Sequence, residues 1–223
     1  MTTRHQLKGS QLENTTEYAD PERFEASIQR YETEDAASPP PTGAIVCVGS
    51  SSMGVWHEWI RDDLAPLTVI PRGFGGSNMN DALHYVDRIV ISYRPRAIVL
   101  YEGDNDLGSG ISPETIADTF RAFVARVHDA LPECRIYVLS VKPSIKRWHL
   151  WNEMQKTNSL IGAQCAEDAR LTLVDVGPGM LDDEGNPRKE IFREDDLHMK
   201  REGYEIWRDA LRPILLAGEQ QYE

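Results

Sequence analysis

The sequence predicts an α/β protein in which a five-stranded parallel sheet carries helices on both faces. Three observations support this. Short apolar runs bounded by glycine or proline alternate with stretches whose apolar residues recur at helical spacing. The runs are apolar almost throughout, as is typical of strands buried on both faces. The chain has 223 residues, 40% of them hydrophobic and 27% charged, which leaves room for one sizeable core and an appendage.

A polar arm with one short helix is expected before the sheet. Residues 1–20 are polar and show no periodicity. Asp20 is a good helix N-cap and Pro21 a good first helical residue. The prolines at 39–41 end the helix and form a stiff spacer. Between these signals, one apolar stripe is formed by Phe24, Ile28 and Tyr31.

The chain therefore divides into an arm, residues 1–40, and a main domain, residues 41–223. The helix of the arm is expected to dock on the main domain or on a partner, and in the second case the arm would join the subunits of a homo-oligomer. Five strands are expected in the main domain, at 44–48, 67–70, 97–101, 135–141 and 171–176.

Helices are expected between these strands. Ser112 is an N-cap and Pro113 a first helical residue for the helix that follows the third strand. Its apolar face consists of Ile116, Phe120, Phe123, Val124 and Val127. Two later helices are predicted by the stripes Leu150, Met154, Ile161 and Cys165, and Tyr204, Trp207, Leu211, Ile214 and Leu215.

Charge and composition exclude several classes of function. The chain has 24 Lys and Arg against 36 Asp and Glu, a net charge of -12, so neither nucleic acid nor an anionic membrane surface is expected as a partner. No apolar run is long enough to span a bilayer, and the N-terminus lacks the apolar region of a signal peptide, so a cytoplasmic protein is expected. Cys47, Cys134 and Cys165 are expected to be buried rather than paired or zinc-bound.

Ligands of such a sheet bind at the carboxyl ends of the strands, and the first strand ends in a run of serines. Gly49-Ser50-Ser51-Ser52-Met53-Gly54 can hold a serine exposed on a tight turn at the start of a helix. A nucleophile, a phosphate cradle of the kind that flavin or nucleotide binders use, and a plain helix cap remain open from this run alone. The G-x-S-x-G elbow is absent, because Met53 takes the place of its second glycine.

Two further elements carry acid–base and anion-binding chemistry. Asp195 and His198 stand three residues apart, so the carboxylate can hold one ring nitrogen and leave the other free to accept a proton. A surface pair and a metal site that includes Asp196 are the alternatives, and no metal is expected. Gly76 can present a backbone N–H to an oxyanion, and Asn105 is a neutral side-chain donor, although either can also be part of an ordinary turn.

The order of these elements resembles the SGNH hydrolases, the GDSL-type esterase superfamily, over roughly residues 44–216. The first block places the nucleophile at Ser51, with Ser50 and Ser52 where the family often has Asp and Leu. Gly76 matches the oxyanion glycine, although Pro71 stands near the position of a frequent asparagine. The blocks Gly-x-Asn-Asp and Asp-x-x-His are intact and contain Asn105, Asp195 and His198.

The resemblance implies a flavodoxin-like three-layer fold and ester hydrolysis without a cofactor. Ser51 would attack the ester, His198 would act as the base and Asp195 would orient it, while Ser51, Gly76 and Asn105 would form the oxyanion hole. The family acts on lipids, thioesters and acetylated sugars. Without a long apolar lid in the sequence, we expect short-acyl or acetyl esters, including those of carbohydrates.

A lipase or thioesterase of the same mechanism and a non-catalytic binding module on the same fold are the alternative functions. The loop after the fourth strand contains Lys142, Arg147 and Trp148, which are candidates for substrate binding. The competing interpretation is a solvated loop with Trp148 packed under the next helix.

Overall fold

The computed structural model describes residues 17–223 and contains the predicted sheet. All strand pairs are parallel, in the order β2-β1-β3-β4-β5, which is the order of flavodoxin-like folds. The predicted fold class is therefore confirmed. The strands are β1 (Ile45–Gly49), β2 (Val69–Gly73), β3 (Ala97–Tyr101), β4 (Arg135–Leu139) and β5 (Leu171–Val174).

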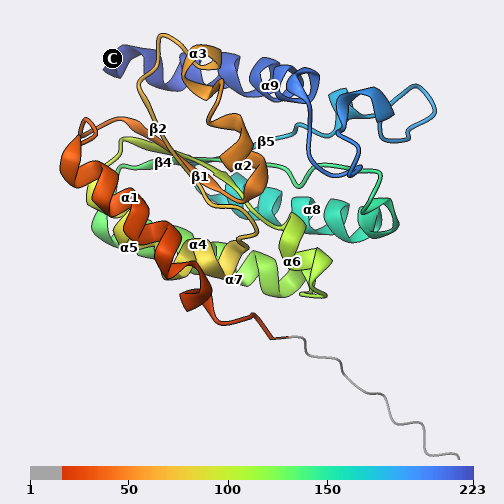
Figure 1. Cartoon of the computed structure of the whole chain (residues 1–223), viewed down its shortest axis with the longest axis horizontal. Coiled ribbons are helices and arrows are strands. Elements are labelled where there is room, and N and C mark those ends of the chain that lie inside the picture. Colours follow the sequence, from red (N-terminus) through yellow and green to blue (C-terminus); the bar gives the residue numbers. More distant parts are fainter. Residues whose placement is uncertain (1–16) are drawn as a thin grey trace, which may run out of the picture.

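Helices cover both faces of the sheet (Figure 1). One layer contains α1 (Glu25–Ala37), α4 (Met79–His84), α5 (Val86–Ile89), α7 (Pro113–Ala130) and α8 (Trp151–Glu167). The other contains α2 (Ser51–Trp56), α3 (Ile60–Asp63) and α9 (Arg201–Glu219). The short α6 (Asp104–Gly108) follows β3, and 3-10 turns lie at Pro21–Phe24, Ile91–Tyr93, Trp148–Leu150, Pro178–Met180, Lys189–Ile191 and Gln220–Tyr222.

Two apolar cores result from the alternation of side chains along the strands. Val46 and Val48 face the layer of α7, where Phe120 and Phe123 are buried. Ile45 and Cys47 face α2 and α9. On α9 the predicted stripe holds except at Ile214, which is 37% exposed. At 100° per residue, Ile214 lies ~80° round the helix from the buried line of Tyr204, Leu211 and Leu215.

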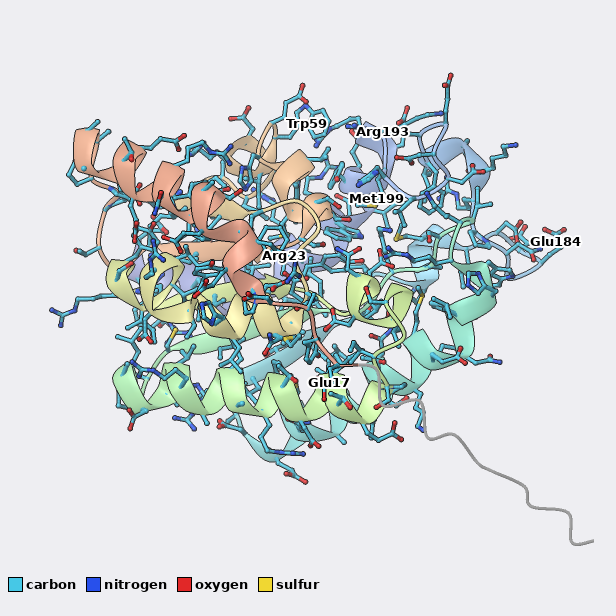
Figure 2. The ribbon with its side chains drawn as sticks, turned by 60° about the horizontal axis from the view of Figure 1, so that its bottom comes forward. Glu17, Arg23, Trp59, Glu184, Arg193 and Met199 are labelled. Carbon is cyan, nitrogen blue, oxygen red and sulfur yellow. The ribbon has the colours of Figure 1, made fainter. Side chains whose placement is uncertain are left out.

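The helix of the arm docks on the main domain. Ile28 and Tyr31 of α1 are buried, and the Tyr31 hydroxyl donates to the carbonyl oxygen of Gly73 in β2 at 2.5 Å. Arg23 lies where the arm meets α4 (Figure 2), and its guanidinium is 2.5 Å from a carboxylate oxygen of Asp81. Apolar burial and these polar contacts therefore fix α1 against β2, and the turn Pro21–Phe24 ahead of it against α4.

Of the polar segment 1–20, residues 1–16 lie outside the described residues, whereas Tyr18 donates a hydrogen bond to Asp106 at 3.0 Å. Within residues 17–223, no helix combines the length and the apolar character that crossing a bilayer needs. The three cysteines are buried and free, as the sequence predicts.

Candidate active site

Ser51 lies at a sharp turn between β1 and α2, and Gly49 makes that turn. Gly49 has a φ of 153°, and a Cβ at this position would lie 2.2 Å from the carbonyl oxygen of Tyr101 in the neighbouring strand. Only glycine therefore fits where the chain leaves the sheet. Ser50 follows as the N-cap and is buried, while Ser51 is the first residue of the helix and partly exposed.

The side chains of Ser51, His198 and Asp195 form a hydrogen-bonded chain. The Ser51 Oγ lies 2.9 Å from the His198 Nε2, and the His198 Nδ1 lies 2.6 Å from an Asp195 carboxylate oxygen. The other Asp195 oxygen accepts the backbone N–H groups of Leu197 and His198, at 3.0 and 2.9 Å. Asp195 is therefore held by its own turn, which is why the spacing of three residues brings carboxylate and ring together.

Electrostatics determine which ring nitrogen of His198 is able to accept a proton. Burial raises the pKa of Asp195, but hydrogen bonds from the His198 ring and from two backbone N–H groups outweigh burial and hold this pKa well below its usual range. The carboxylate thus accepts a hydrogen bond from the His198 Nδ1–H. In the neutral ring, the Nε2 is then unprotonated and can accept the hydroxyl proton of Ser51.

Gly76 lies on the loop after β2 and Asn105 lies in α6, and hydrogen bonds join these two segments. The Asn105 Nδ2 donates to the carbonyl oxygen of Ser77 at 2.8 Å, and Asp106 accepts the backbone N–H groups of Met79 and Gly103, both at 3.0 Å. The loop of Gly76 passes close to the nucleophile, since a Cβ added at Gly75 would lie 3.8 Å from the Ser51 Cβ.

Donors remain free in this region. No acceptor for the backbone N–H of Ser51 or of Gly76 is found among residues 17–223, and the second N–H of the Asn105 amide has none there either. Gly76 has a φ of 89°, which a side chain would strain. Ser51, Gly76 and Asn105 can therefore offer three uncharged donors to an oxyanion.

The loop after β4 contains the three candidates for substrate binding. Two of them, Lys142 and Arg147, bond to other groups of the protein. Lys142 is fully buried: its ammonium donates to the carbonyl oxygen of Leu197 at 3.0 Å and lies 3.4 Å from an Asp104 carboxylate oxygen. It does not face the solvent, because Asp104 and the loop before His198 enclose it. Lys142 thus links the Asn105 loop to the His198 loop instead of lying open to substrate.

Arg147 is also engaged by the protein. Its guanidinium lies 2.6 Å from a carboxylate oxygen of Asp104 and donates to the Asn105 Oδ1 at 3.0 Å. Burial raises the pKa of Asp104, but Lys142 and Arg147 outweigh burial and hold this pKa below its ordinary value. Arg147 binds the oxygen of the Asn105 amide and Ser77 binds its nitrogen, so the amide has one defined orientation.

Trp148, the third candidate, is half-buried and stacks on Trp151 of the next helix, with the ring centroids 5.4 Å apart. This agrees with the packing interpretation. A role in substrate binding stays a prediction.

A cavity of about 320 Å³ borders Ser51 on the side of β2 and α1. It is lined by Ser27, Arg30, Tyr31, Ser51, Gly54, Val55, His57, Gly73, Phe74 and Gly75. The His57 Nε2 accepts the backbone N–H of Gly73 at 2.8 Å. Burial, reinforced by nearby arginines, lowers the pKa of His57 to about 4 and so keeps the ring neutral at pH 7. A larger cavity, about 510 Å³, lies beside α8 and β5 and does not include Ser51.

Sequence reasoning did not find the α1 side of this cavity. Ser27 and Arg30 lie on the polar face of a short helix, where a solvated surface is the default interpretation. Only the docking of α1 on β2 brings them beside Ser51, and no local signal encodes that placement.

Within the described part of the chain, no group of three or more His, Cys, Asp or Glu residues is arranged to hold a metal ion.

Comparison with known proteins identifies the family of the chain. The model of the GDSL-like lipase/acylhydrolase family matches residues 42–206. No curated protein matches the chain.

Solved structures share the fold. A Streptococcus pneumonia protein named in connection with platelet activating factor superposes with a TM-score of 0.75 at 21% identity, covering 86% of this chain and 92% of its own. A GDSL-like lipase from Bacteroides thetaiotaomicron superposes with a TM-score of 0.73 at 21% sequence identity. This match covers 86% of this chain and 98% of the lipase. An acetyl-xylooligosaccharide esterase from Geobacillus Stearmophilus, solved as a mutant, superposes with a TM-score of 0.62 at 14% sequence identity. This match covers 77% of this chain and 93% of the esterase.

Proposed function

The chain belongs to the GDSL-like lipase/acylhydrolase family, and from this premise we propose that it is a serine esterase whose triad is Ser51, His198 and Asp195. The observation that carries the proposal is the 2.9 Å contact between the Ser51 Oγ and the His198 Nε2, continued at 2.6 Å to Asp195. A nucleophile, a base and a group that orients the base are the three parts that acyl transfer needs.

In the first half of the reaction, the Ser51 Oγ attacks the carbonyl carbon of the ester and its proton passes to the His198 Nε2. Asp195 stabilises the imidazolium that forms. The negative oxygen of the tetrahedral intermediate accepts hydrogen bonds from the backbone N–H groups of Ser51 and Gly76 and from the Asn105 side chain. The bond to the alcohol then breaks, His198 protonates the alcohol, and an acyl-Ser51 ester remains.

In the second half, His198 accepts a proton from water as the water oxygen attacks the acyl-Ser51 carbonyl. The same three donors stabilise the second oxyanion. The bond to the Ser51 Oγ breaks, His198 returns its proton to that oxygen, and the carboxylic acid leaves.

We propose short-acyl esters as the substrates, with acetyl groups on carbohydrates as one class. The cavity beside Ser51, about 320 Å³, is at the lower end of the ~300–1,000 Å³ range of ligand pockets, which favours a small group over a long acyl chain. The similarity in fold to an acetyl-xylooligosaccharide esterase is compatible with this class. A lipase or thioesterase of the same mechanism is the alternative.

The test is hydrolysis of a short-chain aryl ester by single variants. Ser51→Ala and His198→Ala are each expected to lower kcat by about 10⁴-fold or more, because each removes one member of a unit that acts together. Ser50→Ala is the matched control: it removes the neighbouring hydroxyl, which makes no contact with His198, and should keep near-parental turnover. Turnover near the parental value in Ser51→Ala or His198→Ala would overturn the assignment, as would labelling of Ser50 or Ser52 instead of Ser51 by an aryl phosphonate.

A further inference from the structure

The cavity beside Ser51 has one wall that the family match does not include. Ser27, Arg30 and Tyr31 of α1 line this cavity together with the nucleophile, whereas the match begins at residue 42. The Tyr31 hydroxyl is bonded to the carbonyl oxygen of Gly73, so α1 is anchored to the strand that forms the facing wall. The arm therefore helps to decide which molecules fit next to Ser51.

Arg30 gives this wall its charge. It is the one charged side chain among the described residues that line the cavity, and no carboxylate lines it. The Arg30 guanidinium bends over the ring of Tyr31, 5.5 Å from the centroid. Its ion-pair partner, Glu34, lies at 3.8 Å, beyond hydrogen-bond distance. The chain has a net charge of -12, so a positively charged wall beside the nucleophile is opposite in sign to the overall charge of the protein.

Two further side chains that line the cavity, those of His57 and Ser27, can add hydrogen-bond donors. The His57 Nε2 already accepts from the backbone of Gly73, so in the neutral ring the proton is on Nδ1, which has no acceptor among residues 17–223. The Ser27 hydroxyl can also donate. A guanidinium, an imidazole N–H and a hydroxyl around a small cavity form a set that fits an oxyanion better than a neutral alkyl group.

We propose that the α1 wall binds an anionic group of the substrate, a carboxylate or phosphate carried by the ester, and that Arg30 determines this specificity. The inference rests on the proposed esterase function and narrows its substrate class. The anionic group can belong to the acyl part or to the alcohol, and both sources have the same recognition chemistry. The wall would attract the charged ester toward Ser51 without taking part in the chemical steps.

The experiment compares charged esters with neutral isosteres. For the alcohol part, the pair is 4-acetoxybenzoate and 4-acetoxybenzamide; for the acyl part, it is the 4-nitrophenyl monoesters of succinate and succinamate. Arg30→Gln should lower kcat/KM about five-fold for at least one anionic ester, the effect of losing an exposed charge pair ~4 Å apart, and leave both neutral esters within about two-fold. The loss should shrink at high salt, since salt screens exposed charges.

Matched variants separate this specificity from general effects. Arg121→Gln removes an arginine of similar exposure, 63% against 61% for the Arg30 side chain, from α7, which does not line the cavity, and should leave kcat/KM for all four esters unchanged. Arg30→Lys should keep most of the preference. Glu34→Gln should strengthen it, because the carboxylate that pairs with Arg30 is removed.

Failure of this inference can be told apart from failure of the esterase assignment. If the parent hydrolyses the neutral esters and Arg30→Gln affects charged and neutral esters equally, the anion site is wrong and the esterase stands. Calorimetric binding of succinate and 4-hydroxybenzoate needs no turnover. Arg30→Gln should weaken one of them about five-fold, and unchanged binding of both would overturn the site even in a protein that hydrolyses none of the esters.

Discussion

Arg147 is expected to control the rate of the chemical step through Asn105. Its guanidinium donates to the Asn105 Oδ1 at 3.0 Å, while the Asn105 Nδ2 donates to the carbonyl oxygen of Ser77. In Arg147→Met the amide keeps only the second contact and is free to rotate. A hydrogen bond to a charged group contributes ~1.5–3 kcal/mol, and an oxyanion donor is worth ~10²–10³ in kcat, so we expect kcat to fall about 10- to 100-fold.

The assay is a double-mutant cycle on kcat and KM for a neutral short-chain aryl ester. If Arg147 acts through Asn105, then adding Arg147→Met to Asn105→Ala should cost less than about two-fold, although it costs at least about ten-fold in the parental protein. KM should change little, because the donor acts on the transition state rather than on the bound ester. Additive losses, or an effect confined to KM, would refute the reasoning.

A second perturbation reaches the same contact without removing the arginine. A Cβ at Gly108 would lie 2.8 Å from the Arg147 Cζ, so Gly108→Ala should push the guanidinium away from Asn105 and lower kcat in the same way. Thermal unfolding followed by circular dichroism provides the control, since all rates must be compared well below each Tm. A Gly108→Ala variant with parental kcat would show that the position of the guanidinium does not matter.

Two further predictions concern the cavity beside Ser51. In a series of aryl esters of increasing acyl length, kcat/KM should be highest at two to four carbons, because the cavity is small, and a preference for ten or more carbons would contradict this. His57 has a pKa of about 4 in the fold against ~6.5 in an unfolded chain, so the unfolded chain binds more protons between these values. This group therefore costs stability as the pH falls from 6.5 toward 4, by at most about 1.4 kcal/mol per pH unit. His57→Gln keeps an acceptor for the Gly73 N–H and should lose less stability over that range in denaturant melts than the parent does; parallel curves would show that His57 is not responsible.

The parts of the fold that could be predicted from sequence are those with a local physical cause. The strands β1 and β3 were recognisable because continuous apolar runs bounded by glycine or proline have few other uses. The start of α7 follows from Ser112, whose side chain accepts the N–H of Thr115, and from Pro113. Asp195 and His198 could be paired because a single turn of chain holds both of them.

The contacts that escaped prediction join residues far apart in the chain. Lys142 stands in a polar loop next to further cations, which favours a solvated interpretation, yet it is buried on Asp104, 38 positions away. Arg147 belongs to the same polar loop and was a candidate for substrate binding, but its guanidinium bonds to Asp104 and Asn105. The stripe of Ile28 and Tyr31 identifies the buried face of α1, but the destination of Arg30 depends on where that face docks, and this is a property of the whole tertiary structure.

The helix α1 lies ahead of the residues that the family model matches, yet it packs beside the proposed nucleophile. Residues 42–206 include the groups to which we assign bond cleavage, whereas the stretch ahead of them supplies a wall of the cavity beside Ser51. A shortened protein cut at the family boundary would expose the apolar surface now covered by Ile28 and Tyr31 and would open that cavity on one side. Substitutions in α1 would thus reshape this wall while Ser51, Asp195 and His198 stay where they are.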